Sequence, residues 1–234
     1  MSAASSDLLL LPGLLNDAAL WTAQIDALSD QARCQVGDLT QGETLEAVAD
    51  AVLAAAPATF ALAGFSLGGY VAQQILRVAP ERVERLALLD TSIRADTPER
   101  LAQRQALAHS ARTTPGLFHG FGEKLMHSYV APSRLHDHAL LDQVRAMTTR
   151  LGAEVFARQS LLARVDGHDV LSNWRKPLLV LCGADDAITP PALLAEIAAL
   201  VPESRLVEIP DCGHLSPLEQ PRAVTDALRE WLVE

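Results

Sequence analysis

Three short stretches carry side chains that could act together as a nucleophile, a base and an orienting acid. Residues 64–68 (GFSLG) place Ser66 between two glycines, Gly213 precedes His214, and Asp185 and Asp186 are adjacent carboxylates. A serine hydroxyl is a weak nucleophile at neutral pH, so it needs a base, and that base needs an acid to orient it. The set predicts covalent catalysis by Ser66.

The two glycines around Ser66 have a physical reason. Where a strand turns sharply into a helix, the central residue is forced into a strained conformation, and a side chain two residues away on either side would clash. The same turn places Ser66 at a helix N-terminus, where free N–H groups favour a developing anion. The same pattern also occurs in ordinary strand–helix turns. Whether it indicates a catalytic serine therefore depends on the surrounding elements.

Apolar runs with strand character alternate with helical patterns along much of the chain. We expect strands at residues 8–11, 33–36, 59–63, 83–89, 177–182 and 205–209. Helices are expected at 17–29, 44–56, 67–78, 190–200 and 217–233. Continuously apolar strands joined by helices indicate a parallel sheet covered on both faces, which is an α/β fold. Ser66, the Asp185–Asp186 pair and His214 each follow an expected strand, so they should meet at one edge of the sheet.

The alternation stops between residues 94 and 171, where we see only helical segments, divided near 113–116, 131–133 and Gly152. We therefore expect residues 1–93 and 172–234 to form the core, and residues 94–171 to form a helical cap over Ser66. Such a cap would exclude water and shape the substrate site. Its arginines could bind a substrate carboxylate or could lie on solvated helix faces: Arg104, Arg112, Arg145, Arg150 and Arg158.

With these residues in place, the chain resembles the α/β-hydrolase-fold family, in particular its capped lipase- and esterase-like members. The likeness covers nearly all of the chain outside the insertion, and the order Ser, Asp, His is the order of that family. In the family the acid follows a Gly-x-x-Asp pattern with Thr-Pro shortly after, which matches Gly183, Asp186 and residues 189–190. The resemblance thus implies Asp186, not Asp185, as the acid.

The family's base lies in a Gly-His segment that is often followed by Glu and Pro, as His214 is followed here by Glu219 and Pro221. The resemblance implies His214 as general base, and an oxyanion hole made by the backbone N–H groups of Leu14 and Leu67.

The chain departs from the family's pattern at two places. Pro12 stands where the family commonly has His, which concerns the side-chain hydrogen bonds of the loop that carries Leu14. The family's leading antiparallel hairpin has no room before the first strand, so we expect about six strands, all parallel, with helices on both faces. Asp90 ends the fourth strand, where some relatives carry the acid; here we expect it to cap a loop.

The resemblance implies a carboxylesterase-like hydrolase that cleaves a small carboxylic ester, or a thioester or lactone, through an acyl-enzyme on Ser66 and without a cofactor. Capped relatives use the same three residues for C–C hydrolysis, lyase, acyl-transfer, amide-hydrolysis or haloperoxidase chemistry, and some are non-catalytic receptors. The fold alone does not decide among these reactions.

The charge composition of the chain limits the classes of molecule that it could bind. The chain has 19 basic and 29 acidic residues and a net charge of −10, which argues against nucleic acid or an anionic membrane as a partner. We expect a small-molecule substrate, and the sequence allows a homo-oligomer without revealing the oligomeric state. The histidines of the insertion match no zinc spacing, so we expect no metal there: His119, His127, His136 and His138.

Cysteine usage and hydropathy bear on location. Three cysteines without a Cys-x-x-Cys pattern indicate no disulfide framework, which fits a reducing compartment. No apolar run approaches membrane-spanning length, and residues 7–13 fit a buried strand better than a signal peptide. We expect a cytoplasmic protein.

Overall fold

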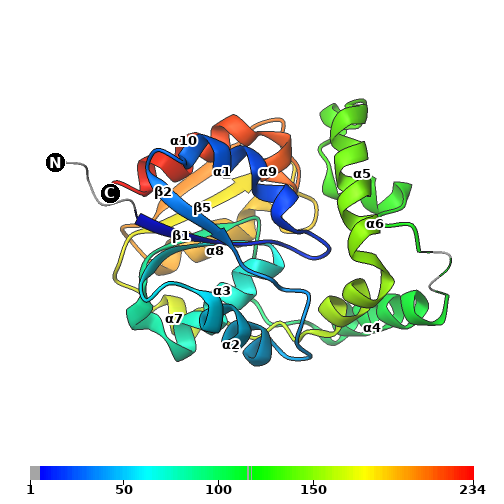
Figure 1. The fold of residues 1–234 in the computed structure, drawn as a ribbon, viewed down its shortest axis with the longest axis horizontal. Coiled ribbons are helices and arrows are strands. Elements are labelled where there is room, and N and C mark those ends of the chain that lie inside the picture. The colour runs from blue at the N-terminus through cyan, green and yellow to red at the C-terminus, as the bar shows by residue number, and fades with distance from the viewer. Residues whose placement is uncertain (1–5, 115, 117) are drawn as a thin grey trace.

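A single parallel sheet organises the computed structural model, which describes residues 6–114, 116 and 118–234. Its strands are β1 (Ser6–Leu11), β2 (Ala32–Val36), β3 (Phe60–Phe65), β4 (Val83–Leu89), β5 (Leu178–Gly183) and β6 (Arg205–Ile209). Their spatial order is β2-β1-β3-β4-β5-β6, and every neighbouring pair is parallel (Figure 1). The predicted α/β-hydrolase fold with six parallel strands is confirmed.

Helices cover both faces of this sheet (Figure 1). One face carries the 3₁₀ turn η1 (Ala18–Trp21), α1 (Thr22–Leu28), α9 (Ser216–Glu219) and α10 (Pro221–Trp231). The other face carries α2 (Leu45–Ala55), α3 (Leu67–Val78), α7 (His168–Leu171) and α8 (Pro191–Leu200). The short 3₁₀ turn η2 (Pro80–Arg82) joins α3 to β4.

The alternation of side chains along the strands divides the apolar core into two layers. In β1, Leu8 and Leu10 pack with α1 and α10, while Leu9 and Leu11 pack with α2 and α3. Successive side chains of a strand point to opposite faces, so a strand covered on both sides must be apolar throughout. Every residue of β3 and β5 is buried accordingly.

Between β4 and β5 the chain leaves the sheet and forms a helical segment at the carboxyl edge of the strands (green in Figure 1). It comprises α4 (Pro98–Thr113), α5 (Glu123–Tyr129), the 3₁₀ turn η4 (Pro132–Arg134) and α6 (His138–Leu161). Gly152 has φ 77° and ψ −179°, which kinks α6 at the division predicted from the sequence. We call α4–α6 the cap.

The last helical region differs from the prediction of one helix over residues 217–233. Two helices, α9 and α10, meet at Gln220, which has φ −132° and ψ 59°. Pro221 follows directly, and a proline disfavours helical geometry for the residue before it. The break matters to the site because it lets Glu219 turn inward, as described below.

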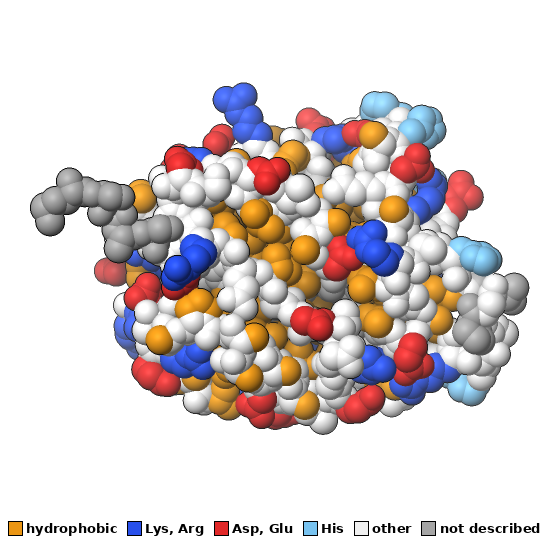
Figure 2. All heavy atoms as spheres, viewed as in Figure 1, with side chains coloured by type: hydrophobic (Ala, Val, Ile, Leu, Met, Phe, Trp, Pro, Cys, Tyr) orange, Lys and Arg blue, Asp and Glu red, His pale blue; other side chains and the backbone are white. Residues whose placement is uncertain are grey.

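The face seen in Figure 2 carries acidic and basic side chains interspersed around a central group of apolar atoms, with histidines gathered toward the cap side. No basic patch stands out on this face. Within the residues that the structure describes, no helix combines the length and apolarity needed to cross a membrane.

Candidate active site

Ser66 lies at the turn from β3 into α3 in a conformation that few residues other than glycine adopt, with φ 52° and ψ −113°. A strained backbone of this kind costs about 1–3 kcal/mol and persists only where its surroundings hold it. Here the Ser66 N–H donates to Leu89 O at 2.9 Å, and Ser66 O accepts from Thr91 Oγ1 at 2.8 Å. The next strand thus fixes the turn from both sides.

The glycines on either side of Ser66 are required by close backbone approach. A Cβ on Gly64 would lie 2.5 Å from Gly68 O, and a Cβ on Gly68 would overlap Leu11 O at the end of β1. The turn therefore sits directly against the loop that follows β1.

A continuous hydrogen-bond chain links the three residues singled out from the sequence. His214 Nε2 lies 2.8 Å from Ser66 Oγ, and His214 Nδ1 lies 2.8 Å from Asp186 Oδ2. His214 and Asp186 are buried, at 0% and 3% exposure, whereas Ser66 is partly exposed. With the Nδ1 proton directed to the carboxylate, Nε2 presents its lone pair to the serine hydroxyl, which is the arrangement that activates a serine.

Asp186 is held in one orientation by its own loop. Its Oδ1 accepts the N–H groups of Ile188 and Thr189 at 2.8 and 2.9 Å, and its Oδ2 accepts the Thr189 hydroxyl at 2.7 Å. Burial alone would raise the pKa of Asp186, but His214 and these donors outweigh it and lower the pKa below its usual value. The alternative carboxylate, Asp185, is exposed, whereas Asp186 is buried against His214.

The ring of His214 is enclosed by two aromatic side chains. Phe65 lies 5.2 Å away between ring centroids, and Tyr129 meets the imidazole edge-on at 5.1 Å. The His214 N–H also donates to Tyr129 O at 2.8 Å. Tyr129 ends α5, so the cap touches the base directly.

Glu219 fixes the loop that carries His214. Its buried carboxylate accepts the N–H groups of Gly213 and Leu215 at 3.0 Å each, and that of Ala131 in the cap at 2.8 Å. Burial raises the pKa of this carboxyl group, and the three N–H donors offset part of the rise. One side chain thus ties both neighbours of His214 to the base of the cap.

The two backbone amides expected to bind an oxyanion lie on elements that the structure brings together. Leu67 is the first residue of α3, and Leu14 follows β1 in the loop against which the turn packs. In the part of the chain that the structure describes, neither N–H has a protein acceptor. The neighbouring Leu15 N–H donates to Gln159 Oε1 of α6 at 2.8 Å, which secures the loop although Pro12 replaces the family's usual histidine.

Asp90 does not contact His214. It is fully buried at the end of β4, where Oδ1 accepts the Gly183 N–H at 2.9 Å and Oδ2 pairs with the Ser216 hydroxyl. It therefore joins β4, β5 and α9, in keeping with the loop-capping role expected from the sequence. Burial raises its pKa well above the usual value, and the charge of Asp186 raises it further.

Replacing Asp90 by asparagine should preserve both hydrogen bonds, whereas Asp90→Ala should cost about 1–3 kcal/mol by leaving the buried Gly183 N–H unpaired.

The raised folded-state pKa of Asp90 also makes the wild type lose stability as pH rises from about 4 through that pKa, because the unfolded chain releases the proton first. Urea unfolding at several pH values tests both points. Two results would contradict these expectations: equal free energies of unfolding for the two variants, or a free energy of unfolding in Asp90→Asn that depends on pH as it does in the wild type.

The arginines named from the sequence are all paired with carboxylates. Their ion pairs are Arg104–Asp96, Arg112–Glu154, Arg145–Asp142, Arg150–Asp17, and Arg158 with Glu43 and Glu154. Sequence reasoning missed another arginine, Arg164, which follows α6 and stacks over Tyr70 near the site. Nothing in the local sequence distinguishes it; only the return of the chain from the cap places it there.

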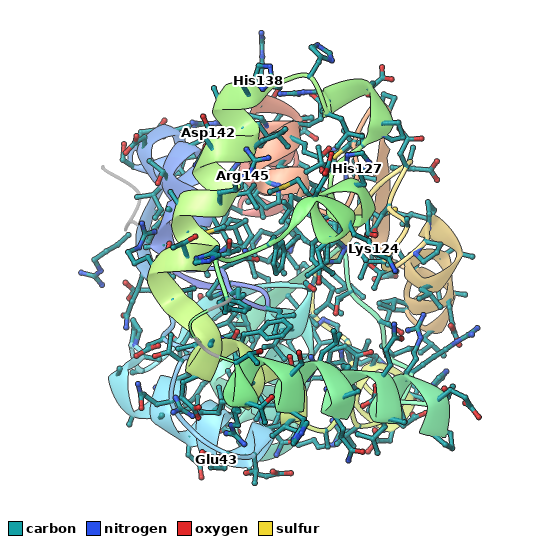
Figure 3. All side chains as sticks on the ribbon, turned by 90° about the vertical axis from the view of Figure 1, so that its right-hand side faces the viewer. Glu43, Lys124, His127, His138, Asp142 and Arg145 are labelled. Carbon is teal, nitrogen blue, oxygen red and sulfur yellow. The ribbon has the colours of Figure 1, made fainter. Side chains whose placement is uncertain are left out.

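The histidines of the cap do not converge. Figure 3 shows His127 on α5 and His138 at the start of α6, at separate positions. Among the described residues, no three His, Cys, Asp or Glu side chains gather in a way that could hold a metal ion.

Comparison with known proteins identifies the family that this chain resembles. Residues 8–227 match the alpha/beta hydrolase family. The chain is 31% identical over 233 residues to a pimeloyl-[acyl-carrier protein] methyl ester esterase of Aromatoleum aromaticum, covering 92% of this chain and 93% of that protein.

Two solved structures are also similar. An esterase from Thermogutta terrifontis, solved with malate bound, has a TM-score of 0.87 and 33% identity over 99% of this chain and 91% of that one. The enol-lactonase of Burkholderia xenovorans has a TM-score of 0.82 at 23% identity, over 99% of this chain and 93% of that chain, and supports the fold alone.

Proposed function

This chain belongs to the alpha/beta hydrolase family, and from that premise we propose that it is a carboxylesterase-like enzyme that cleaves small carboxylic esters with Ser66 as nucleophile. The observation that carries the proposal is the hydrogen-bond chain from Asp186 through His214 to Ser66 Oγ. The Aromatoleum relative, named for a methyl ester, supports a substrate with a small alcohol group.

The reaction follows from the placement of these atoms. As Ser66 Oγ attacks the ester carbonyl, His214 Nε2 takes the hydroxyl proton, and Asp186 stabilises the imidazolium that forms. The amides of Leu14 and Leu67 donate to the carbonyl oxygen as it becomes negative. His214 then passes the proton to the departing alcohol, leaving an acyl group on Ser66. A water molecule, deprotonated by His214, releases the acid and restores the serine.

A substrate panel tests this reaction type. We expect hydrolysis of methyl and ethyl esters of short acids, with lactones and thioesters as slower or comparable substrates, because each presents the same activated carbonyl. A burst of alcohol equal to the enzyme concentration would report acyl-enzyme formation when deacylation is slower. Turnover confined to amides, β-dicarbonyl compounds or halide oxidation, with no ester cleaved, would overturn the proposal.

The expected location and partners remain part of this proposal. Three free thiols, at Cys34, Cys182 and Cys212, suit a reducing compartment such as the cytoplasm. The interspersed surface charges of Figure 2 and the net charge of −10 suit a small-molecule substrate better than nucleic acid or an anionic membrane.

A further inference from the structure

The connections between the core and the cap place an arginine beside the site. The outgoing segment and the returning segment run side by side: Asp96 N donates to Arg164 O at 3.2 Å, and Gly167 N donates to Ile93 O at 2.8 Å. Arg164 N donates in turn to Asp96 Oδ2 at 3.1 Å. The backbone of Arg164 is therefore held firmly at the base of the cap.

The side chain of Arg164 lies against the helix that follows the nucleophile. Its guanidinium lies 5.5 Å from the ring centre of Tyr70, in the first turns of the helix that begins after Ser66. Burial raises the pKa of Tyr129, the residue edge-on to His214, to about 12, and the positive charge of Arg164 opposes that rise. Arg164 therefore stacks on a side chain of the helix that begins directly after the catalytic serine.

The guanidinium of Arg164 is only partly satisfied. Within the side chains that the structure describes, its donors reach Leu162 O at 2.7 Å and Gln159 O at 3.4 Å, both through Nη1. Nε and Nη2 donate to no acceptor among the described residues, and neither atom is fully buried. An arginine offers five donors in a planar fork that matches a carboxylate, so two directions of that fork remain available.

The charge of Arg164 is not neutralised locally. The nearby carboxylate of Asp96 is engaged by Arg104, and no described carboxylate lies within ion-pair distance of the Arg164 side chain. The group of Arg104, Arg164 and Asp96 thus carries a net positive charge. Enclosure by protein, and then the charge of Arg104, lower the pKa of Arg164 to about 10, which still leaves it charged at neutral pH.

We infer that Arg164 binds a free carboxylate on the substrate, so that the preferred esters are half-esters of dicarboxylic acids. The inference rests on the proposed ester hydrolysis and narrows its substrate class. Arg164 is partly buried and has no protein counter-ion among the described residues, and a ligand carboxylate would supply that partner. The paired cap arginines leave no comparable vacancy, and the overall charge of −10 means that attraction of an anion must be local.

The experiment compares each half-ester with its carboxamide. Monomethyl esters of straight-chain dicarboxylic acids, from succinate to suberate, are assayed beside the same molecules with the free carboxylate replaced by a carboxamide. For the best chain length we expect Arg164→Gln to lower kcat/KM on the half-ester by about 10- to 100-fold, the usual range for a hydrogen-bonded charge, and to leave the carboxamide nearly unchanged. Arg164→Lys should recover part of the loss.

Arg112→Gln is the matched control, because Arg112 lies in the same insertion but is exposed and paired with Glu154. It should not change the preference. Thermal unfolding and fluorophosphonate labelling of Ser66 report whether Arg164→Gln keeps the fold and the nucleophile. Equal losses on half-ester and carboxamide would show a structural role only and would overturn the inference, as would a wild type without preference for the carboxylate.

Direct binding separates this inference from the reaction itself. In Ser66→Ala, calorimetry with the dicarboxylates succinate to suberate should show binding that Arg164→Gln weakens by about 10-fold or more. If dicarboxylates bind in this way but the wild type hydrolyses no ester, the proposed reaction is wrong and the carboxylate site remains. Ester turnover with dicarboxylate binding that is absent or independent of Arg164 would do the opposite.

Discussion

Replacement of His214 by alanine is expected to lower kcat for ester hydrolysis about 10⁶-fold, the scale found when the base of a serine hydrolase is removed. Without Nε2 at 2.8 Å from Ser66 Oγ, no described group is placed to accept the hydroxyl proton. Residual hydrolysis of about 10³-fold over water should remain, because the oxyanion donors and the binding surface are unchanged. Steady-state kinetics on a methyl ester measures the loss.

The fold must be monitored in the same experiment, because His214 is fully buried between Phe65 and Tyr129. His214→Gln fills more of the space and serves as the second variant. Both should retain cooperative unfolding and lose activity together. Loss of only a few-fold in either folded variant would show that another group acts as base.

Replacement of Asp186 by asparagine is expected to lower kcat about 10⁴-fold with little change in fold. An amide can donate to Nδ1, which would favour the tautomer with its proton on Nε2, and that tautomer cannot accept from Ser66 Oγ. The amide also supplies no charge to stabilise the imidazolium.

The adjacent Asp185→Asn is a matched control for this change, because Asp185 is exposed and one residue away. It should keep nearly full activity in the same assay. If Asp185→Asn lost activity, or if Asp186→Asn retained wild-type kcat, Asp186 would not be the acid that orients His214.

The features that could be predicted from the sequence are those set by local rules. Ser66 was recognisable because a tight strand–helix turn imposes glycines at fixed spacing, and Gly64 and Gly68 do meet backbone atoms there. Apolar runs of strand length specified all six strands to within a few residues. Gly152 was recognisable as a division of the cap because a left-handed backbone conformation favours glycine.

The features that the sequence did not reveal depend on contacts between distant segments. In the sequence Glu219 is only part of a family pattern, yet its carboxylate binds both the His214 loop and Ala131 of the cap. Arg164 has no distinguishing neighbours in the sequence and gains its position from the pairing of the cap's two connecting segments. Tyr129 likewise reaches His214 only because α5 ends over the site. Neither residue periodicity nor motif spacing predicts such contacts between distant segments.

The role of Ser66 as nucleophile is tested most directly by the mass of the protein after reaction with a fluorophosphonate, followed by peptide mapping. We expect one adduct per chain, located on Ser66. It should form in the wild type and in Arg164→Gln, be absent from Ser66→Ala and form much more slowly in His214→Gln. An unlabelled wild type, or an adduct on any residue other than Ser66, would contradict that role.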